Sequence, residues 1–244
     1  MGKINRGQSL WKVAITTSAM AIFSIAGNAT AADLNETAIA TPDGGLYVSA
    51  KVGASTLDHS IFRLESTPGL PVADSTGVFS TDSTDVSFGG AIGYEHYLGD
   101  GQTFLGIEGF YNFENASTRN VAGVLVTDVD LEASYGARIL AGFKTADRVS
   151  IYAHGGVTWL DYEIGNSYTF APPVRSRSDT EAGFSYGVGV GYDFTEKATA
   201  FVEYTQITDV EFDGIAEVAG GTGRVNRNEL DLQSISFGIK FSLN

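Results

Sequence analysis

From about residue 44 to the end of the chain, large apolar residues alternate with glycine, serine, alanine or charged residues in eight separate runs. Such a period of two places successive side chains on opposite faces of an extended backbone, so each run predicts a β-strand. In the clearest run, aromatic and valine residues from Phe184 to Phe194 alternate with Gly183, Ser185, Gly187, Gly189, Gly191 and Asp193. Each predicted strand therefore has one apolar face and one face of small or polar residues.

The small-residue face decides between two kinds of β-fold. In a soluble β-sandwich or lipocalin-like barrel, the aromatic face would be the core, and rows such as Gly187, Gly189 and Gly191 would form a poor solvent surface with few charges. In a membrane barrel, the aromatic face meets lipid, while glycine and charged residues share a narrow lumen. The 30 glycines favour the membrane barrel. Since lipid tolerates no open sheet edge, the first and last strands must pair.

The connections between the runs alternate in length. Short turns are predicted at 98–102, 144–148 and 195–197, and longer polar links at about 58–84, 115–127, 163–181 and 208–228. This asymmetry is typical of short periplasmic turns and long external loops. We therefore expect an all-β fold, an up-and-down antiparallel eight-stranded transmembrane β-barrel with both termini in the periplasm. Above Ile235 the last run loses its phase, because Leu230 and Leu232 fall on the lumen side, which predicts a bulge or an early strand end there.

The first residues have the features of an export signal. Lys3, Arg6 and Lys12 precede an apolar stretch, and small residues at 29–31 suit a signal peptidase. The alternative, a single membrane helix, is disfavoured because the apolar run is shorter than the roughly 20 residues that a bilayer requires. We expect residues 1–31 to be a signal peptide that directs export by the Sec route, 32–43 a short periplasmic lead-in, and 44–244 the barrel domain. Removing three basic residues makes the formal charge of −14 more negative, which disfavours a nucleic-acid partner.

Several short stretches resemble a known family. They are Leu46-Tyr47-Val48-Ser49-Ala50-Lys51-Val52-Gly53, Tyr135-Gly136-Ala137-Arg138, Gly187-Val188-Gly189-Val190-Gly191-Tyr192, Val202-Glu203-Tyr204 and Phe237-Gly238-Ile239-Lys240-Phe241. From Leu46 to Asn244 the chain resembles the OmpA-like and opacity-type eight-stranded outer-membrane barrels, often grouped with porin-family proteins. The resemblance implies a bacterial outer-membrane location, contact with lipid and lipopolysaccharide, and insertion by the barrel-assembly machinery. Such proteins usually end on an aromatic residue, whereas Phe241 is followed by Ser242-Leu243-Asn244, a departure that concerns the assembly signal rather than the fold.

Charged and polar residues of the small-residue face are predicted to meet in the lumen. The set is Lys51, Glu108, Glu132, Arg138, His154, Glu203 and Lys240. One interpretation is a closed, charge-paired network with water in its gaps, since unpaired charges in a confined lumen are costly, and the resemblance suggests the same. The other is a gated ion pathway in which Arg138 exchanges partners between the glutamates. An eight-stranded interior is just wide enough to be filled by side chains, so a wide pore is disfavoured.

No catalytic or metal-binding pattern stands out. Of the histidines, His59 falls at a predicted loop start, His96 near a periplasmic turn on the outward phase, and His154 in the lumen before two glycines, unlike the arrangement in outer-membrane deacylases. No cluster has the spacing of metal ligands. We expect no enzyme activity and no cofactor.

The predicted external loops are the other candidate site, because loops on a rigid scaffold carry recognition. Possible contact residues are Phe62, Tyr168, Phe170, Arg175 and Arg177. Aromatic and arginine side chains suit binding to a host or matrix ligand, and the arginines equally suit lipopolysaccharide phosphates. We expect a monomer with a structural, envelope-integrity or surface-interaction role. The alternatives are a narrow ion-selective channel and an adhesin that acts through its loops.

Overall fold

The computed structural model describes residues 44–66, 73–99, 101–122, 125–146, 148–168, 175–213, 217–219 and 222–243. Its strands are β1 (Gly45–Ser66), β2 (Ala73–Leu98), β3 (Thr103–Phe113), β4 (Ser117–Ala122), β5 (Leu125–Ala146), β6 (Val149–Tyr168), β7 (Arg175–Asp193), β8 (Ala198–Asp213), β9 (Glu217–Ala219) and β10 (Thr222–Ser242). The expected signal peptide and lead-in lie outside the described residues. In the described part of the chain, no helix is long and apolar enough to cross a membrane.

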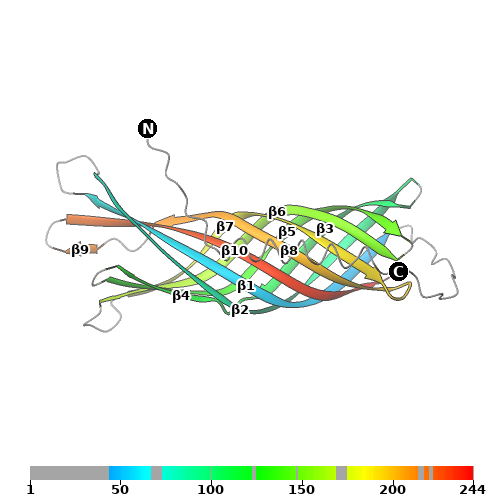
Figure 1. The fold of residues 1–244 in the computed structure, drawn as a ribbon, viewed down its shortest axis with the longest axis horizontal. Coiled ribbons are helices and arrows are strands. Elements are labelled where there is room, and N and C mark those ends of the chain that lie inside the picture. Colours follow the sequence, from blue (N-terminus) through cyan, green and yellow to red (C-terminus); the bar gives the residue numbers. More distant parts are fainter. Residues whose placement is uncertain are drawn as a thin grey trace. The chain divides into compact units, whose positions relative to one another are not determined.

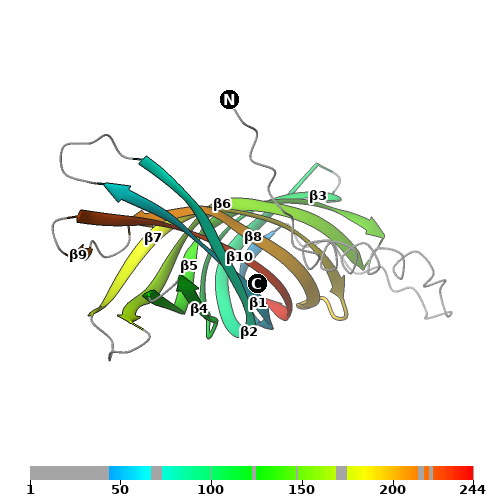
Figure 2. The same cartoon turned by 60° about the vertical axis from the view of Figure 1, so that its left-hand side comes forward.

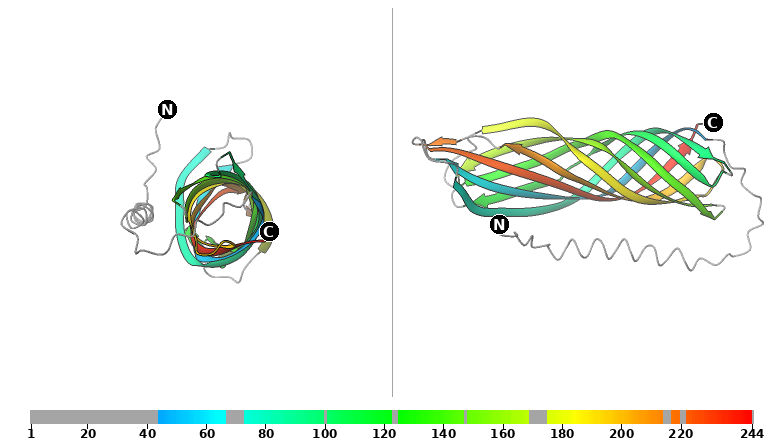
Figure 3. Two further views of the ribbon diagram at one scale, coloured as in Figure 1. Left: turned by 90° about the vertical axis from the view of Figure 1, so that its right-hand side faces the viewer. Right: turned by 90° about the horizontal axis from the view of Figure 1, so that it is seen from above.

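The strands form one closed antiparallel ring (Figures 1 and 3). Neighbours follow the order β1-β2-β3-β5-β6-β7-β8-β10, and β10 pairs back to β1 from Tyr47↔Ser242 to Ser66↔Gly223. β4 pairs only with β5 and continues the line of β3 after a break at 114–116, while β9 pairs only with β10. The fold is therefore an eight-stranded up-and-down barrel, as the alternating runs predict, and its short turns lie where the sequence places them.

The lumen of an eight-stranded barrel is narrow, and glycines line it where large side chains fill it. A Cβ atom at Gly187 would collide with the ring of His154 and the carbonyl oxygen of Tyr204. One at Gly189 would collide with the ring of Tyr152. Larger residues at these two positions would displace the very side chains that fill the barrel, which explains the glycine rows of β7.

The outer surface of the barrel has two different halves. Around the half that carries the short turns, apolar side chains such as Ile107, Ile139 and Val188 are exposed, as contact with lipid requires. In the other half, which we call the head, exposed residues such as Asp82 and Asp130 are polar, and most of the described apolar side chains point inward, with Val121 an exposed exception. The head comprises residues 56–66 of β1, 73–85 of β2, β4, 125–132 of β5, 160–168 of β6, 175–183 of β7, 207–213 of β8 and 222–233 of β10.

The interior of the head is a buried apolar cluster, which we call the head core. Its members are Leu57, Ala116, Val129, Leu131, Leu160, Tyr162, Ile164, Ile207, Val210, Phe212, Leu230 and Leu232. The prediction of long loops at about 58–84, 115–127, 163–181 and 208–228 is therefore wrong, since most of these residues continue the strands. The alternating runs of the sequence break off at the start of the head because the apolar face turns there from the outside of the barrel to its inside.

Two β-bulges accompany this change. In β5, Leu131 pairs with Tyr162 and Ala133 with Asp161, so Glu132 is the extra residue. This bulge turns Val129 and Leu131 into the lumen, although their alternation with Tyr135 suggested the lipid face. The second bulge lies in β8, opposite Leu230 and Leu232 of β10. The sequence predicts a bulge or an early end in the last strand itself. β10 pairs with β1 without a register shift and continues to Thr222, so both forms of that prediction are wrong.

The head is not a closed ring but two facing sheets (Figure 2). Pairing of β7 with β8 stops at Phe184↔Thr208, and pairing of β2 with β3 stops at Phe88↔Phe113. Beyond these points, β4-β5-β6-β7 form one sheet and β2-β1-β10-β8 the other. The head core lies between the two sheets. In it, the ring centroids of Tyr162 and Phe212 are 4.6 Å apart. Open edges are tolerated there because they lie beyond the apolar belt that faces lipid.

Candidate functional site

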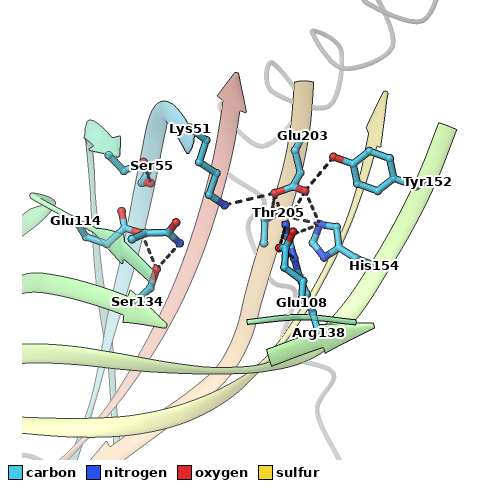
Figure 4. Close-up of polar contacts among 12 residues, drawn as sticks. Lys51, Ser55, Glu108, Glu114, Ser134, Arg138, Tyr152, His154, Glu203 and Thr205 are labelled. Carbon is cyan, nitrogen blue, oxygen red and sulfur yellow. Dashed lines mark hydrogen bonds and ion pairs between the residues drawn. The ribbon is translucent and has the colours of Figure 1, made fainter. Parts of the chain in front are cut away.

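The centre of the lipid-level lumen is an arginine held by two carboxylates (Figure 4). Arg138 from β5 donates through Nη1 and Nη2 to the two carboxylate oxygens of Glu203 from β8, each at 2.9 Å. Its Nε donates to Oε1 of Glu108 from β3 at 2.6 Å. Arg138 and Glu108 are 5% exposed and Glu203 is 1% exposed. Bidentate, charge-assisted bonds of this kind hold a buried arginine that would be very costly if left unpaired.

A second set of side chains completes this cluster. Tyr47 Oη donates to Glu108 at 2.8 Å, and Tyr152 Oη donates to Glu203 at 3.1 Å. Lys51 Nζ lies 3.4 Å from Glu203, and His154 Nε2 lies 3.3 Å from Arg138 Nη1. Since the guanidinium can only donate, this contact requires a neutral His154 that accepts through Nε2. We call these residues, with Arg138, Glu108 and Glu203, the arginine cluster.

Two further ion pairs lie at the end of the barrel near the short turns, which we call the mouth: Lys240–Glu95 and Lys144–Asp193. Lys240 Nζ lies 2.8 Å from both carboxylate oxygens of Glu95, and Lys144 Nζ lies 3.1 Å from Asp193. A cavity of about 50 Å³ lies among these four residues, and one of about 30 Å³ continues from Lys240 up to Arg138. These polar spaces can hold a few water molecules. The lumen therefore has room for water from the mouth up to the arginine cluster.

The structure brings together five of the seven predicted lumen residues: Lys51, Glu108, Arg138, His154 and Glu203. Lys240 is inside the barrel but belongs to the mouth, where it pairs with Glu95. Glu132 was placed on the wrong face, because it is the bulged residue of β5 and is exposed on the outer surface of the head.

His59 also differs from its prediction as a loop residue. It lies in β1, is fully buried in the head, and its Nε2 lies 3.0 Å from Oδ1 of Asn228. Its Nδ1 lies 3.3 Å from the hydroxyl of Thr118. Burial lowers the pKa of His59, and the hydrogen bond to Asn228 acts in the opposite direction. His96 is exposed, as its phase predicts.

The predicted loop contacts are described only in part. Phe170 lies outside the described residues, and Phe62, Tyr168 and Arg175 lie in strands at positions whose side chains are not described. Arg177 is exposed in β7 and forms an ion pair with Asp179.

The arginine cluster and the mouth contain polar residues that the predicted set lacks: Tyr47, Glu95, Tyr152 and the pair Lys144–Asp193. The first three lie on the small-residue faces of their runs, so strand phase alone was enough to find them. Lys144 was assigned to a turn, and nothing in the sequence links it to Asp193. Among the described residues, no group of three or more histidine, aspartate or glutamate side chains could hold a metal ion.

A closed antiparallel ring with an apolar belt outside and ion pairs inside defines a transmembrane β-barrel of the bacterial outer-membrane class. The sequence matches the family described as "Outer membrane protein beta-barrel domain" over residues 16–242, and the chain belongs to that family. A search of curated protein sequences gives no match.

Three solved structures illustrate the similarity. OprG from Pseudomonas aeruginosa has 10% identity and a TM-score of 0.47, with 83% of this chain and 99% of OprG covered. Neisserial surface protein A has 16% identity and a TM-score of 0.41, with 82% and 97% covered. Ail, the attachment invasion locus protein of Yersinia pestis, has 12% identity and a TM-score of 0.37, with 81% and 99% covered.

Proposed function

We propose that this protein is a non-conducting outer-membrane barrel with a structural or surface-interaction role. The observation that carries this proposal is that the lumen is closed at two levels. At the lipid level the arginine cluster fills it, and in the head the head core fills it with apolar side chains. An ion that passed through the lumen would have to break the ion pairs of the arginine cluster and then lose its hydration shell in the head core.

The head core argues most directly against the narrow-channel alternative. Leu57, Leu160 and Leu230 are fully buried where the two sheets face each other. An exchange of carboxylate partners by Arg138 would leave these side chains in place. The gate of the channel hypothesis therefore opens only the arginine cluster and leaves the head core closed.

The position of the head supports one orientation in the membrane. The strand ends Gly45 and Ser242 lie at the end of the barrel that carries the short turns, away from the head. We propose that this end faces the periplasm, after export by the Sec route and removal of residues 1–31, and that the head faces the exterior. The polar outer surface of the head supports this, since it suits water and polar lipid headgroups rather than acyl chains.

Planar-bilayer recordings on the refolded mature barrel test the closed lumen. We expect no steady conductance from the wild type, and none from Arg138→Ala, because the head core still closes the lumen above the altered cluster. A variant with Arg138→Ala, Leu160→Ser and Leu230→Ser opens both levels and serves as the positive control. Steady, ion-selective steps from the wild type that Arg138→Ala abolishes would show that the protein is a channel.

A surface role is tested by altering the chain between β1 and β2 without touching their pairing. Replacement of residues 67–72 by a glycine-serine linker leaves every described pair of these strands intact. We expect heat-modifiable migration to be unchanged and adhesion of expressing cells to matrix proteins to fall. Unchanged adhesion would exclude this segment as the contact.

A further inference from the structure

A third layer of side chains lies between the arginine cluster and the head core. It consists of one carboxylate and small polar residues at the same level of the barrel, and we call it the glutamate layer. Its members are Ser55, Ser87, Asn112, Glu114 and Ser134, with Thr158 and Ser185 placed at this level by the register of β6 and β7. Figure 4 shows Glu114, Ser134 and Ser55 together, on the side of Lys51 away from Glu203. Neither the arginine cluster nor the head core explains why a carboxylate is buried here.

The hydrogen bonds around Glu114 favour its ionised form. Ser134 Oγ donates to Glu114 Oε1 at 2.7 Å, and Asn112 Nδ2 donates to Ser134 Oγ at 3.0 Å. The single hydroxyl proton of Ser134 is therefore used on Glu114, which acts as an acceptor. Hydrogen bonds donated to a carboxylate stabilise its charged form, whereas burial, the larger effect at Glu114, opposes ionisation. A charged Glu114 therefore needs a cation beside it.

Counting charges leaves Glu114 uncompensated. The arginine cluster and the glutamate layer hold two permanent cations, Arg138 and Lys51, against three carboxylates, Glu108, Glu203 and Glu114. Arg138 is saturated by the first two carboxylates, and Lys51 contacts Glu203 at 3.4 Å. Within the described lumen, no cationic group lies at ion-pair distance from Glu114, and the surplus is one negative charge.

Unpaired oxygen atoms lie in the same layer. Glu114 Oε2, Asn112 Oδ1, Thr158 Oγ1 and Ser185 Oγ are buried without a hydrogen-bond partner among the described residues. Glu114 is 8% exposed, and Thr158 and Ser185 are 0% and 1% exposed. A buried carboxylate oxygen without a partner is costly, and carboxylate, hydroxyl and amide oxygens are the ligands that hard cations prefer.

We propose that Glu114 binds one monovalent alkali cation, Na⁺ or K⁺, inside the glutamate layer. A single positive charge neutralises the surplus, whereas Ca²⁺ would replace a surplus of −1 by one of +1. A divalent site would also need more carboxylates than the one present here. The head core above and the arginine cluster below enclose the layer, so the cation is taken up as the barrel closes and stabilises the folded state.

The test compares the stability of the refolded mature barrel in NaCl, KCl and choline chloride at equal ionic strength. Choline is too large for the layer, so the wild type should unfold at lower urea in choline chloride. A cation present at about ten times its Kd shifts the folding equilibrium about tenfold. Glu114→Gln should remove the difference between the salts. Glu163→Gln, the same change at a carboxylate outside the lumen on β6, should preserve it.

Two further measurements keep the proposal decidable. If Glu114→Gln does not fold, Ser134→Ala retains the carboxylate and should reduce the dependence on alkali cation. Sodium NMR relaxation should detect bound Na⁺ in the wild type and not in the variant. Equal stability of the wild type in all three salts, or a Glu114→Gln barrel more stable than the wild type in every salt, would overturn the proposal in favour of a protonated Glu114. Stabilisation by added CaCl₂ and not by NaCl or KCl would overturn it in favour of a divalent site.

Discussion

The carboxylates of this barrel differ in what they contact, so the same substitution should have different effects at different positions. Glu203 is bonded to Arg138 and Tyr152 in the lumen, whereas Glu132 is exposed on the outer surface of the head. Glu203→Gln should destabilise the barrel by about 3–5 kcal/mol, because it breaks a buried ion pair. Glu132→Gln should change the stability by less than about 0.5 kcal/mol. Urea unfolding in micelles measures both, and similar effects would contradict the two placements.

His59 should make the head sensitive to acid. Its pKa is lowered in the fold from the ordinary value of 6.5, chiefly by burial. The unfolded chain therefore binds a proton more readily, so the stabilisation is complete above about pH 6.5 and is lost as the pH falls below that value. The neutral partners Asn228 and Thr118 offer no negative charge to a protonated ring.

Comparison with His59→Gln isolates this contribution, since the remaining titrating groups are common to both proteins. Below about pH 6.5 the urea midpoint of the wild type should fall more steeply than that of the variant. Parallel pH profiles would show that His59 does not titrate with unfolding.

The elements show where sequence reasoning succeeds and where it stops. A period of two in the sequence predicts the eight strands of the barrel and, between them, the short turns. It also places Glu108, Arg138 and Glu203 in the lumen. The bulge at Glu132 cannot be predicted from this period. One extra residue reverses the face of residues 125–131 relative to a regular strand, and no sequence pattern marks it. The head does not follow from the period either, because its apolar residues lie inside the barrel whereas those of the membrane part lie outside.

Deletion of Asp130 should damage the head selectively. The bulge at Glu132 is kept, but the residues of β5 before Leu131 change phase, so Val129 would point outward and Asp128 inward into the head core. The membrane part of β5, from Ser134 onward, keeps its register with β6. We expect heat-modifiable migration to remain and limited proteolysis of the head to become faster.

The control is deletion of Glu132, which removes the extra residue itself. Ala133 then follows Leu131 directly, both keep their partners Tyr162 and Asp161, and Leu131 still points into the head core. This variant should be as protease-resistant as the wild type. An Asp130 deletion that is equally resistant would mean that β5 tolerates either phase in the head.

The outer surface of the barrel matches two environments, lipid around the membrane part and water around the head. Along the same strands the exposed side chains change from apolar, such as Ile139, to acidic, such as Asp130, while the lumen changes from ion pairs to leucine. The boundary carries a row of aromatic rings: Tyr111, Tyr135 and Trp159 stack across β3, β5 and β6 with centroids about 6 Å apart. Aromatic residues in such a row mark the interface between acyl chains and headgroups.

Trp159 reports directly on this boundary. The other tryptophan, Trp11, belongs to the expected signal peptide, so Trp159 is the single tryptophan of the expected mature chain. In vesicles of brominated lipids, its fluorescence should be quenched more by bromines near the glycerol backbone than by bromines at the chain ends. A variant with Trp159→Phe and Thr180→Trp, which moves the probe to an exposed position in the head, should escape both quenchers. Strong quenching of the Thr180→Trp probe would place the head in the bilayer, and its polar outer surface would then need a different explanation.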